Sequence, residues 1–177
     1  MHGVEPSPWV TRFAPLIATG GTVLDVAAGP GRHSRYLAAR GCTVEAVDRD
    51  AEALATLAGC DGIHTCCADI EGGPWPYHGR SFDAIVVTRY LWRPLLPTLC
   101  AALAPGGVLI YETFMVGHEA YGKPSNPAYL LRPGELLDVV RNRLGIVAFE
   151  QGEEPGDKGP QVMQRLCAQR GGTLRLA

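Results

Sequence analysis

The segment "VLDVAAGPGRHSRYLAARGCTVEAVDRD" (23–50) constrains the fold of this chain more than any other stretch. An apolar run that contains Asp25 leads through a Gly-Pro-Gly turn into a helical segment, and a second apolar run ends at Asp48. Glycines let a ligand approach the backbone, and the amides at a helix N-terminus face electron-rich groups. This order of elements is therefore typical of an α/β sheet that binds a nucleoside.

The two acids of this segment indicate which nucleoside is bound. Asp48 is placed to accept hydrogen bonds from two ribose hydroxyls. Its other interpretation is a carboxylate that starts the next helix, a role that Asp50 also offers. Asp25 suits a cationic, amino-acid-like group better than a pyrophosphate, and it therefore favours S-adenosylmethionine over NAD.

Size and charge limit the class of protein. With 177 residues, the chain is expected to form a single domain (1–177) with a sizeable core. A net charge of −2 provides no overall positive field for nucleic acid or an anionic membrane. No apolar run approaches the ~20 residues of a membrane span, and the N-terminus lacks a secretory pattern, so we expect a cytoplasmic protein. The six cysteines have no metal-ligand spacing, so we expect free thiols and no metal site.

Strand and helix patterns alternate along the chain, which predicts a doubly wound, mostly parallel α/β sheet. The expected strands are 22–27, 43–48, 62–69, 82–88, 106–114, 146–152 and 160–170. The expected helices are 32–41, 51–59, 95–107 and 133–145, the third of them ended by Pro105 and the following glycines.

The last two predicted strands are joined by "EEPGDKG" (153–159). A parallel crossover needs a dozen or more residues, usually with a helix, and this connection is too short and too rich in glycine, proline and charge. We therefore expect a C-terminal antiparallel hairpin, which is unlike a dinucleotide-binding dehydrogenase domain.

With these features, the chain from about Thr22 to its end resembles the class I S-adenosylmethionine-dependent methyltransferases, whose sheet has seven strands. The stretches "RYLWRPLLP" (89–97) and "LIYETFMVGHEAYGKPSNPAYLLRPGELL" (109–137) are similar to a compact bacterial subgroup of the tellurite-resistance type. The glycine motif of the family, acid-x-Gly-x-Gly-x-Gly, reads here Asp25, Ala27, Gly29 and Gly31. An alanine at the first glycine is a mild departure if that backbone is not at positive φ.

The resemblance implies S-adenosylmethionine as the methyl donor and S-adenosylhomocysteine as the product. In this family Asp25 would approach the donor's ammonium group, and Asp69 would accept from the adenine amino group. The alternative for Asp69 is a turn-forming aspartate before "EGG". The full set of implied donor-binding residues is Asp25, Ala27, Gly29, Gly31, Asp48, Arg49, Asp69, Ile70 and Thr88.

The acceptor is expected beside the segment Thr88, Arg89 and Tyr90, at the carboxyl edge of the sheet. The Asn/Asp-Pro-Pro-aromatic motif of nucleic-acid base methylases is missing there, which counts against a nucleic-acid partner. Arg89 and Arg93 would bind an anionic acceptor or form an ordinary exposed pair. The candidate acid/base groups are Tyr90, Glu112 and His118, with Tyr121 beside them.

Two segments are expected to enclose the site. The long loop 114–132 is expected to be a substrate loop, because loops of this length in compact domains are usually functional. The N-terminal segment 1–21 is expected to act as a cover through Trp9, Arg12 and Phe13; alternatively Trp9 and Phe13 only seal the core.

The predicted function is methyl transfer to a small-molecule acceptor, such as a thiol or another soft nucleophile, by a monomer or homodimer. A non-catalytic nucleoside-binding or protein-interaction domain is the alternative, because no general base stands out. An NAD-dependent oxidoreductase is disfavoured by Asp25, by the hairpin, and by Ser34, which stands near where a third glycine is expected.

Overall fold

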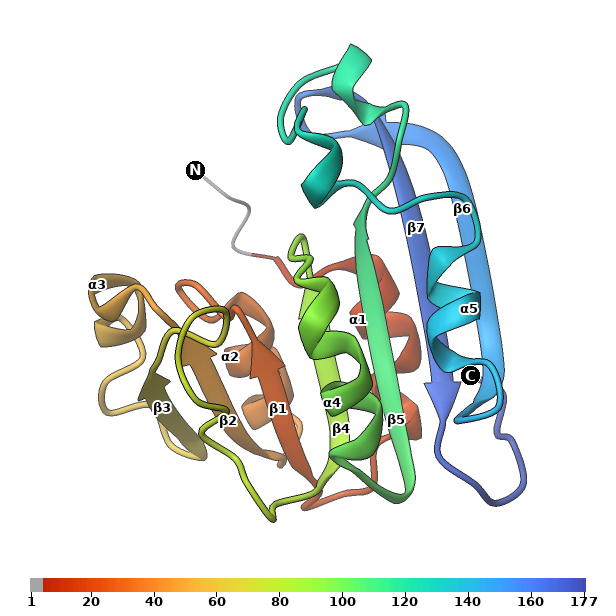
Figure 1. Cartoon of the computed structure of the whole chain (residues 1–177). Helices are drawn as coiled ribbons and strands as arrows, with labels where there is room; N and C mark the ends of the chain where they lie inside the picture. The colour runs from red at the N-terminus through yellow and green to blue at the C-terminus, as the bar shows by residue number, and fades with distance from the viewer. Residues whose placement is uncertain (1–4) are drawn as a thin grey trace.

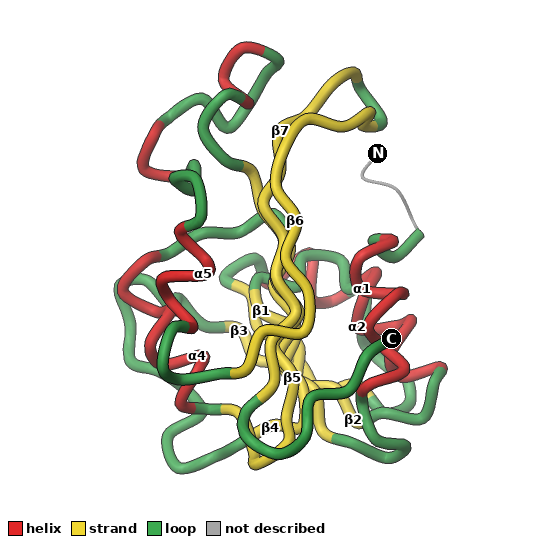
Figure 2. The backbone as a smooth tube through the Cα atoms, turned by 90° about the vertical axis from the view of Figure 1, so that its right-hand side faces the viewer, coloured by secondary structure: helices red, strands yellow, loops and turns green. Residues whose placement is uncertain are grey.

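The computed structural model describes residues 5–177, in which a seven-stranded sheet lies between two layers of helices (Figures 1 and 2). The strand order is β3-β2-β1-β4-β5-β7-β6. The strands are β1 (Thr22–Val26), β2 (Thr43–Asp48), β3 (Ile63–Cys67), β4 (Phe82–Thr88), β5 (Leu103–Phe114), β6 (Gly145–Gly156) and β7 (Gly159–Gln169). The predicted α/β fold with seven strands is confirmed.

Helices cover both faces of the sheet, α4 and α5 on one side and α1 and α2 on the other (Figure 2). The helices are α1 (Pro8–Phe13), α2 (Arg32–Ala39), α3 (Ala51–Ala55), α4 (Leu96–Ala101) and α5 (Glu135–Val140). Short 3-10 turns lie at Ala14–Leu16, Arg93–Leu95, His118–Ala120 and Pro127–Tyr129. Asp50 caps α3 as predicted, since its side chain accepts from the N–H groups of Glu52 and Ala53. None of the helices within residues 5–177 is long and apolar enough to cross a membrane.

The first five strands are parallel, so their carboxyl ends meet at one edge of the sheet. Strand β1 pairs with β2 on one side and with β4 on the other. The chain therefore reverses its winding direction at β1 and β4, and ligands of open α/β sheets bind beside such a switch point.

The C-terminal hairpin is antiparallel, as predicted, and longer than predicted. Strand β7 pairs antiparallel with both β5 and β6. The predicted connection 153–159 is wrong, because β6 continues to Gly156 and only Asp157 and Lys158 separate the two strands. Cross-strand hydrogen bonding from Gln161 to Glu154 supports this extension. The hairpin tip consequently rises beyond the carboxyl edge of the central strands (Figure 1).

The predicted helix 95–107 is too long at its C-terminal end. Helix α4 ends at Ala101, and the stretch Pro105–Gly107 belongs to β5. The backbone of Arg170 pairs with Gly106 and Gly107, and its guanidinium donates to the carbonyl of Ala101. These contacts come from the far end of the chain, and they hold the segment extended.

The core is divided between the two faces of the sheet, since alternate residues of a strand point to opposite sides. One cluster, which contains Ile85 and Tyr111, lies under α4 and α5. The other contains Val86 and Ile110 with Trp9 and Phe13 of α1. The indole N–H of Trp9 donates to the carbonyl of Leu166 at 3.2 Å. Trp9 and Phe13 therefore seal the core, and they do not cover the carboxyl edge.

Candidate functional site

Two cavities lie side by side at the carboxyl edge of the sheet. The first, of about 410 Å³, is lined by the segments that follow β2, β3 and β4, together with Thr113, Pro124 and Tyr129. The second, of about 500 Å³, lies between the glycine turn, the end of β4, the 114–123 segment and the hairpin tip 157–161. Ala27 and Arg89 line both cavities, so the two spaces share a wall.

The shared wall is built from strained backbone. Ala27 and Arg89 each have a φ of 54°, in the left-handed region, and Asn142 is the third non-glycine residue there among residues 5–177. Such a conformation costs about 1–3 kcal/mol and is typical of functional sites. The expectation that the alanine is only a mild departure from glycine therefore does not hold, because its backbone has the positive φ that favours glycine.

Gly29 and Gly31, the two glycines of the turn, have different roles. Gly29 has a φ of 54°, and a Cβ at this position would meet no atom within 4 Å, so the residue faces open space in the second cavity. A Cβ on Gly31 would lie 2.5 Å from the side chain of Leu57. Gly31 lines neither cavity. It allows the turn to pack closely on the α3 segment, and the structure gives it no contact with the site.

Asp48 lines the first cavity. Its Oδ2 accepts from the backbone N–H of Gly29 at 2.8 Å, and its Oδ1 accepts from that of Asp50 at 2.9 Å. Asp50 caps the helix, so the alternative role for Asp48 is already filled by its neighbour. Arg49 lines the same cavity.

Asp25 is buried beneath the glycine turn and lines neither cavity. The hydroxyl of Ser34 donates to its Oδ2 at 2.6 Å. Burial raises the pKa of Asp25 from 3.8 to about 6, although the Ser34 hydrogen bond opposes the shift. The negative charge of Asp25 is therefore costly in this structure, and a cation beside it would stabilise that charge.

The far end of the first cavity contains Asp69, Ile70 and Tyr90. Asp69 takes the turn-forming role of the alternative prediction, since its Oδ1 accepts from the N–H groups of Glu71 and Gly72. The buried hydroxyl of Tyr90 has no hydrogen-bond partner among residues 5–177, and burial raises the pKa of Tyr90. An unpaired buried hydroxyl of this kind fits a cavity that receives a polar ligand.

The second cavity contains a histidine, His33, that was not among the predicted site residues. His33 is buried, and its Nε2 accepts from the backbone N–H of Ser7 at 3.2 Å. Burial, with the neighbouring Arg32 and Arg89, lowers the pKa of His33 to about 3, so the ring is neutral. The remaining nitrogen, Nδ1, then donates to the hydroxyl of Thr88 at 3.4 Å. In the sequence, only the position of His33 in the first turn of the helix after the glycine turn indicated that it would lie at the site.

Two of the predicted acid/base groups are committed to other contacts. Glu112 is buried, lines neither cavity and forms an ion pair with Arg165 at 2.9 Å. His118 lines the second cavity, but its Nδ1 accepts from the N–H of Val162 at 3.4 Å and its Nε2 donates to the carbonyl of Lys123 at 3.2 Å. The structure therefore does not present either side chain as a free acid or base.

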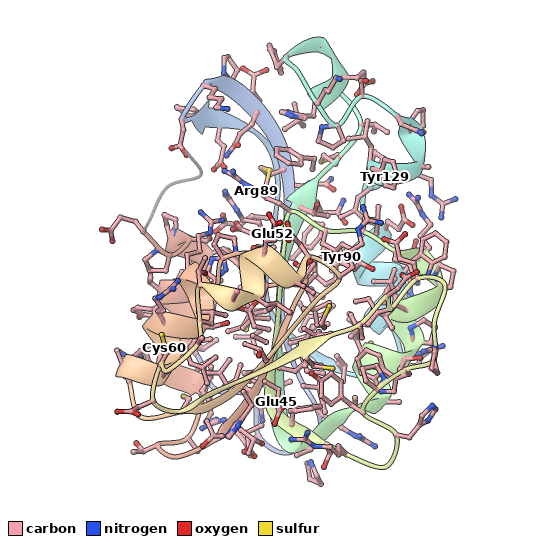
Figure 3. The ribbon with its side chains drawn as sticks, turned by 90° about the vertical axis from the view of Figure 1, so that its left-hand side faces the viewer. Glu45, Glu52, Cys60, Arg89, Tyr90 and Tyr129 are labelled. Carbon is pink, nitrogen blue, oxygen red and sulfur yellow. The ribbon has the colours of Figure 1, made fainter. Side chains whose placement is uncertain are left out.

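Arg89 and Arg93, the two arginines predicted to bind an anionic acceptor or to form an exposed pair, have different surroundings. The guanidinium of Arg93 contacts both carboxylate oxygens of Glu135, at 2.7 and 3.0 Å, and donates to the carbonyls of Ala128 and Leu130. Arg93 therefore holds the end of the 114–132 loop in place. Arg89 remains at the cavities, and Figure 3 shows it with Tyr90 at the edge of the sheet, near Tyr129 of the loop.

No group of three His, Cys, Asp or Glu side chains within residues 5–177 is arranged to hold a metal ion.

Comparison with known proteins gives a family match over slightly less than half of the chain, and a fold. Residues 23–107 match the family described as "Methyltransferase domain". No curated protein matches the chain in sequence.

Similar solved structures cover nearly the whole chain. TehB from Haemophilus influenzae matches with a TM-score of 0.77 and 19% identity over 94% of this chain, which spans only 63% of the length of TehB. A SAM-dependent methyltransferase from Methanosarcina mazei gives a TM-score of 0.72 and 18% identity, over 94% of this chain and 98% of that one. A Burkholderia thailandensis 1,6-didemethyltoxoflavin-N1-methyltransferase gives a TM-score of 0.66 and 20% identity, over 93% of this chain and 76% of that one. At these identities, the structural likeness establishes the fold.

Proposed function

We propose that this chain is a class I S-adenosylmethionine-dependent methyltransferase and that it methylates a small-molecule acceptor. Its fold and the family match of residues 23–107 support the proposal. The observation that carries the proposal is the pair of cavities that meet at Ala27 and Arg89. Two adjoining spaces at one switch point suit a donor and an acceptor whose reacting atoms must meet.

The first cavity fits the adenosine part of the donor. Asp48 accepts only one hydrogen bond at each carboxylate oxygen, so it retains acceptor capacity for ribose hydroxyls. Ile70 offers an apolar surface for a base, and the unpaired hydroxyl of Tyr90 offers a polar contact. These residues support an adenosine site in the first cavity.

The glycine turn supports the placement of the methionine part beside the second cavity. Gly29 leaves open space there, and Thr88 and Arg32 lie on the same wall. Asp25, with Ser34, lies beneath the turn as a partner for an ammonium group. When bound, the donor supplies an activated methyl group, so the residues of this chain have mainly to position the reactants and exclude water.

The state of the acid/base candidates supports an acceptor that needs little proton removal. Glu112 and His118 are engaged, and the raised pKa of Tyr90 makes its hydroxyl a poor base at neutral pH. A thiol, or another soft nucleophile with an available lone pair, meets this condition. The fold also accommodates small acceptors: the Burkholderia relative was crystallised with 1,6-didemethyltoxoflavin and S-adenosylhomocysteine.

Calorimetric titration with S-adenosylhomocysteine, with NAD as the control, tests the donor site. We expect micromolar affinity for S-adenosylhomocysteine and no binding of NAD. Binding of NAD alone would overturn the proposal.

The engagement of Glu112 and His118 favours one second candidate, a nucleoside-binding domain without catalysis. Incubation with methyl-labelled S-adenosylmethionine and a panel of thiols and small carboxylic acids separates the two. Label transferred to an acceptor identifies an enzyme. Donor binding with no transfer to any member of the panel would favour the non-catalytic domain.

A further inference from the structure

The second cavity is lined by an unusual concentration of positive charge. Its walls include Arg32 and Arg89 beside the glycine turn and Lys123 and Lys158 on the opposite side, with Asp157 as the acidic residue. Lys123 and Lys158 are also the two lysines of the entire sequence. One belongs to the 114–132 loop and the other to the hairpin tip, so the fold brings both to one space.

These four cations have no carboxylate ion-pair partner within residues 5–177, whereas half of the other twelve cations do. Within residues 5–177, ion pairs with carboxylates are formed by Arg12, Arg80, Arg93, Arg132, Arg141 and Arg165. None of the four cavity cations belongs to this set, although Asp157 lines the same space. Their charges are therefore available to a ligand, and their effect is already felt by His33, whose pKa Arg32 and Arg89 help to lower.

A planar aromatic wall adjoins the charge. The rings of Phe114 and His118 stack with centroids 4.1 Å apart and planes 20° apart. The guanidinium of Arg89 lies 5.9 Å from the centroid of Phe114. The cavity thus places two aromatic side chains directly beside cationic groups, an arrangement suited to an unsaturated molecule that carries an anionic group.

Part of this charge serves the donor. If S-adenosylmethionine binds as proposed above, its carboxylate takes one cation, and Arg32 is the one that follows the glycine turn. Three cations then remain for the acceptor. Arg89, Lys123 and Lys158 are all exposed at the cavity, and an anionic group on the acceptor would offset the repulsion among their like charges.

We propose, on the basis of the proposed function, that the acceptor carries a carboxylate or phosphate group bound by Arg89, Lys123 and Lys158, with its body against Phe114 and His118. The loop and the hairpin tip would then select the acceptor, while the glycine turn and the ends of β2 and β3 select the donor. Charge-assisted hydrogen bonds to the anionic group would provide most of this discrimination.

Binding to the protein saturated with S-adenosylhomocysteine tests the proposal, because the donor's carboxylate then already has its partner. The probes are benzoate, phenyl phosphate and benzamide, the last being an uncharged match for benzoate in shape. We expect benzoate or phenyl phosphate to bind about tenfold more tightly than benzamide. The better of the two anions identifies the acceptor's charged group.

The variant Lys123→Met/Lys158→Met should lose about tenfold in affinity for the anionic probe and keep its affinity for S-adenosylhomocysteine. Arg175→Met is the matched control: it removes a cation from the exposed C-terminal tail, which lines neither cavity. Equal binding of benzoate, phenyl phosphate and benzamide, or equal anion affinity in the double variant and the control, would overturn the proposal. If the unmodified protein does not bind S-adenosylhomocysteine, that result contradicts the proposed function instead.

Chemical reactivity gives a second readout that does not depend on a variant. Acetylation of the two lysines, followed by peptide mass spectrometry, should be slowed by the bound anion at both Lys123 and Lys158 and be unaffected by benzamide. Unchanged acetylation of both lysines in saturating anion would contradict their assignment to the acceptor site.

Discussion

The carboxylate of Asp48 accepts a hydrogen bond from the backbone N–H of Gly29, 2.8 Å from its Oδ2, and so ties the end of β2 to the glycine turn after β1. The residue proposed to bind the ribose therefore also fixes the turn that faces the rest of the donor. Ligand binding and loop order are linked through one side chain.

Replacement of Asp48 by alanine should weaken S-adenosylhomocysteine binding by about 1–3 kcal/mol, because ribose hydroxyls lose their acceptor and Gly29 loses its anchor. Calorimetry on the folded variant measures the change. Asp138→Ala, which removes an exposed acid from α5, is the control and should bind as the unmodified protein does. Unchanged affinity of Asp48→Ala for S-adenosylhomocysteine would show that Asp48 does not belong to the donor site.

Tyr90→Phe should have opposite effects on stability and on binding. Loss of a buried, unpaired hydroxyl should raise the free energy of unfolding by up to ~1 kcal/mol, whereas S-adenosylhomocysteine affinity should fall by a similar amount. Tyr77 is the matched control, since its hydroxyl is also buried and unpaired but lines neither cavity. Tyr77→Phe should stabilise without changing affinity. The same affinity in both variants would place the Tyr90 hydroxyl outside the ligand's reach.

Ala27→Gly should stabilise the protein by about 0.5–1 kcal/mol, because relief of the left-handed alanine exceeds the entropy cost of the glycine. Ala28→Gly, next to it and outside the left-handed region, should instead destabilise by at least about 0.5 kcal/mol. Urea unfolding of both variants gives the comparison. Equal losses of stability would show that Ala27 carries no backbone strain.

Asp25 and His33 should affect the acid stability of the protein with opposite signs. The folded pKa of Asp25, about 6, lies above its ordinary value, so its contribution favours folding more as pH falls from about 6 to about 4. The folded pKa of His33, about 3, lies below its ordinary 6.5, so stability is lost as pH falls through that range and the unfolded chain takes up the proton.

Asp25→Asn should therefore make the loss of stability between pH 7 and 4.5 steeper, and His33→Gln should make it shallower. Urea unfolding at several pH values measures both slopes. In the unmodified protein, S-adenosylhomocysteine affinity should also rise as pH passes 6, since the ionised Asp25 attracts the ammonium group. The same pH profile of affinity in Asp25→Asn would refute that role.

Arg93→Ala should lower the free energy of unfolding by about 2 kcal/mol. Its partner Glu135 is buried, but the Arg93 side chain is 34% exposed, so the loss should be smaller than the ~3–5 kcal/mol of a fully buried pair. Arg141→Ala breaks an exposed pair with Asp138 and should cost less than about 0.5 kcal/mol. Similar losses in both variants would mean that Arg93 does not anchor the loop.

Features of the fold that depend on neighbouring residues in the chain were predictable from the sequence. The parallel strands, the antiparallel end of the sheet, the cap at Asp50 and the position of Asp48 at the carboxyl edge all follow from periodicity, turn residues and chain length between strands. The positions of Asp48, Asp69 and Ile70 in the wall of the first cavity follow for the same reason, since strand ends determine which residues meet there.

Features that depend on distant partners were not predictable. Glu112 meets Arg165 across 53 positions and His118 meets Val162 across 44, so nothing near either acid/base candidate reveals that it is engaged. The packing of Gly31 on Leu57 and the link between Ser7 and His33 are of the same kind. The ends of α4 and β6 were misplaced because strand pairing, rather than local propensity, decides them.

The division of the two cavities along the chain bears on how such a protein changes its chemistry. The family match ends at residue 107, whereas Lys123, Lys158 and the aromatic wall all come later. If the acceptor binds as proposed, exchange of the hairpin tip between relatives would change the contacts of the acceptor and leave the ends of β2 and β3 as they are. The 114–132 loop lines both cavities, with Pro124 and Tyr129 in the first and Lys123 in the second, so its exchange would alter the contacts of donor and acceptor together.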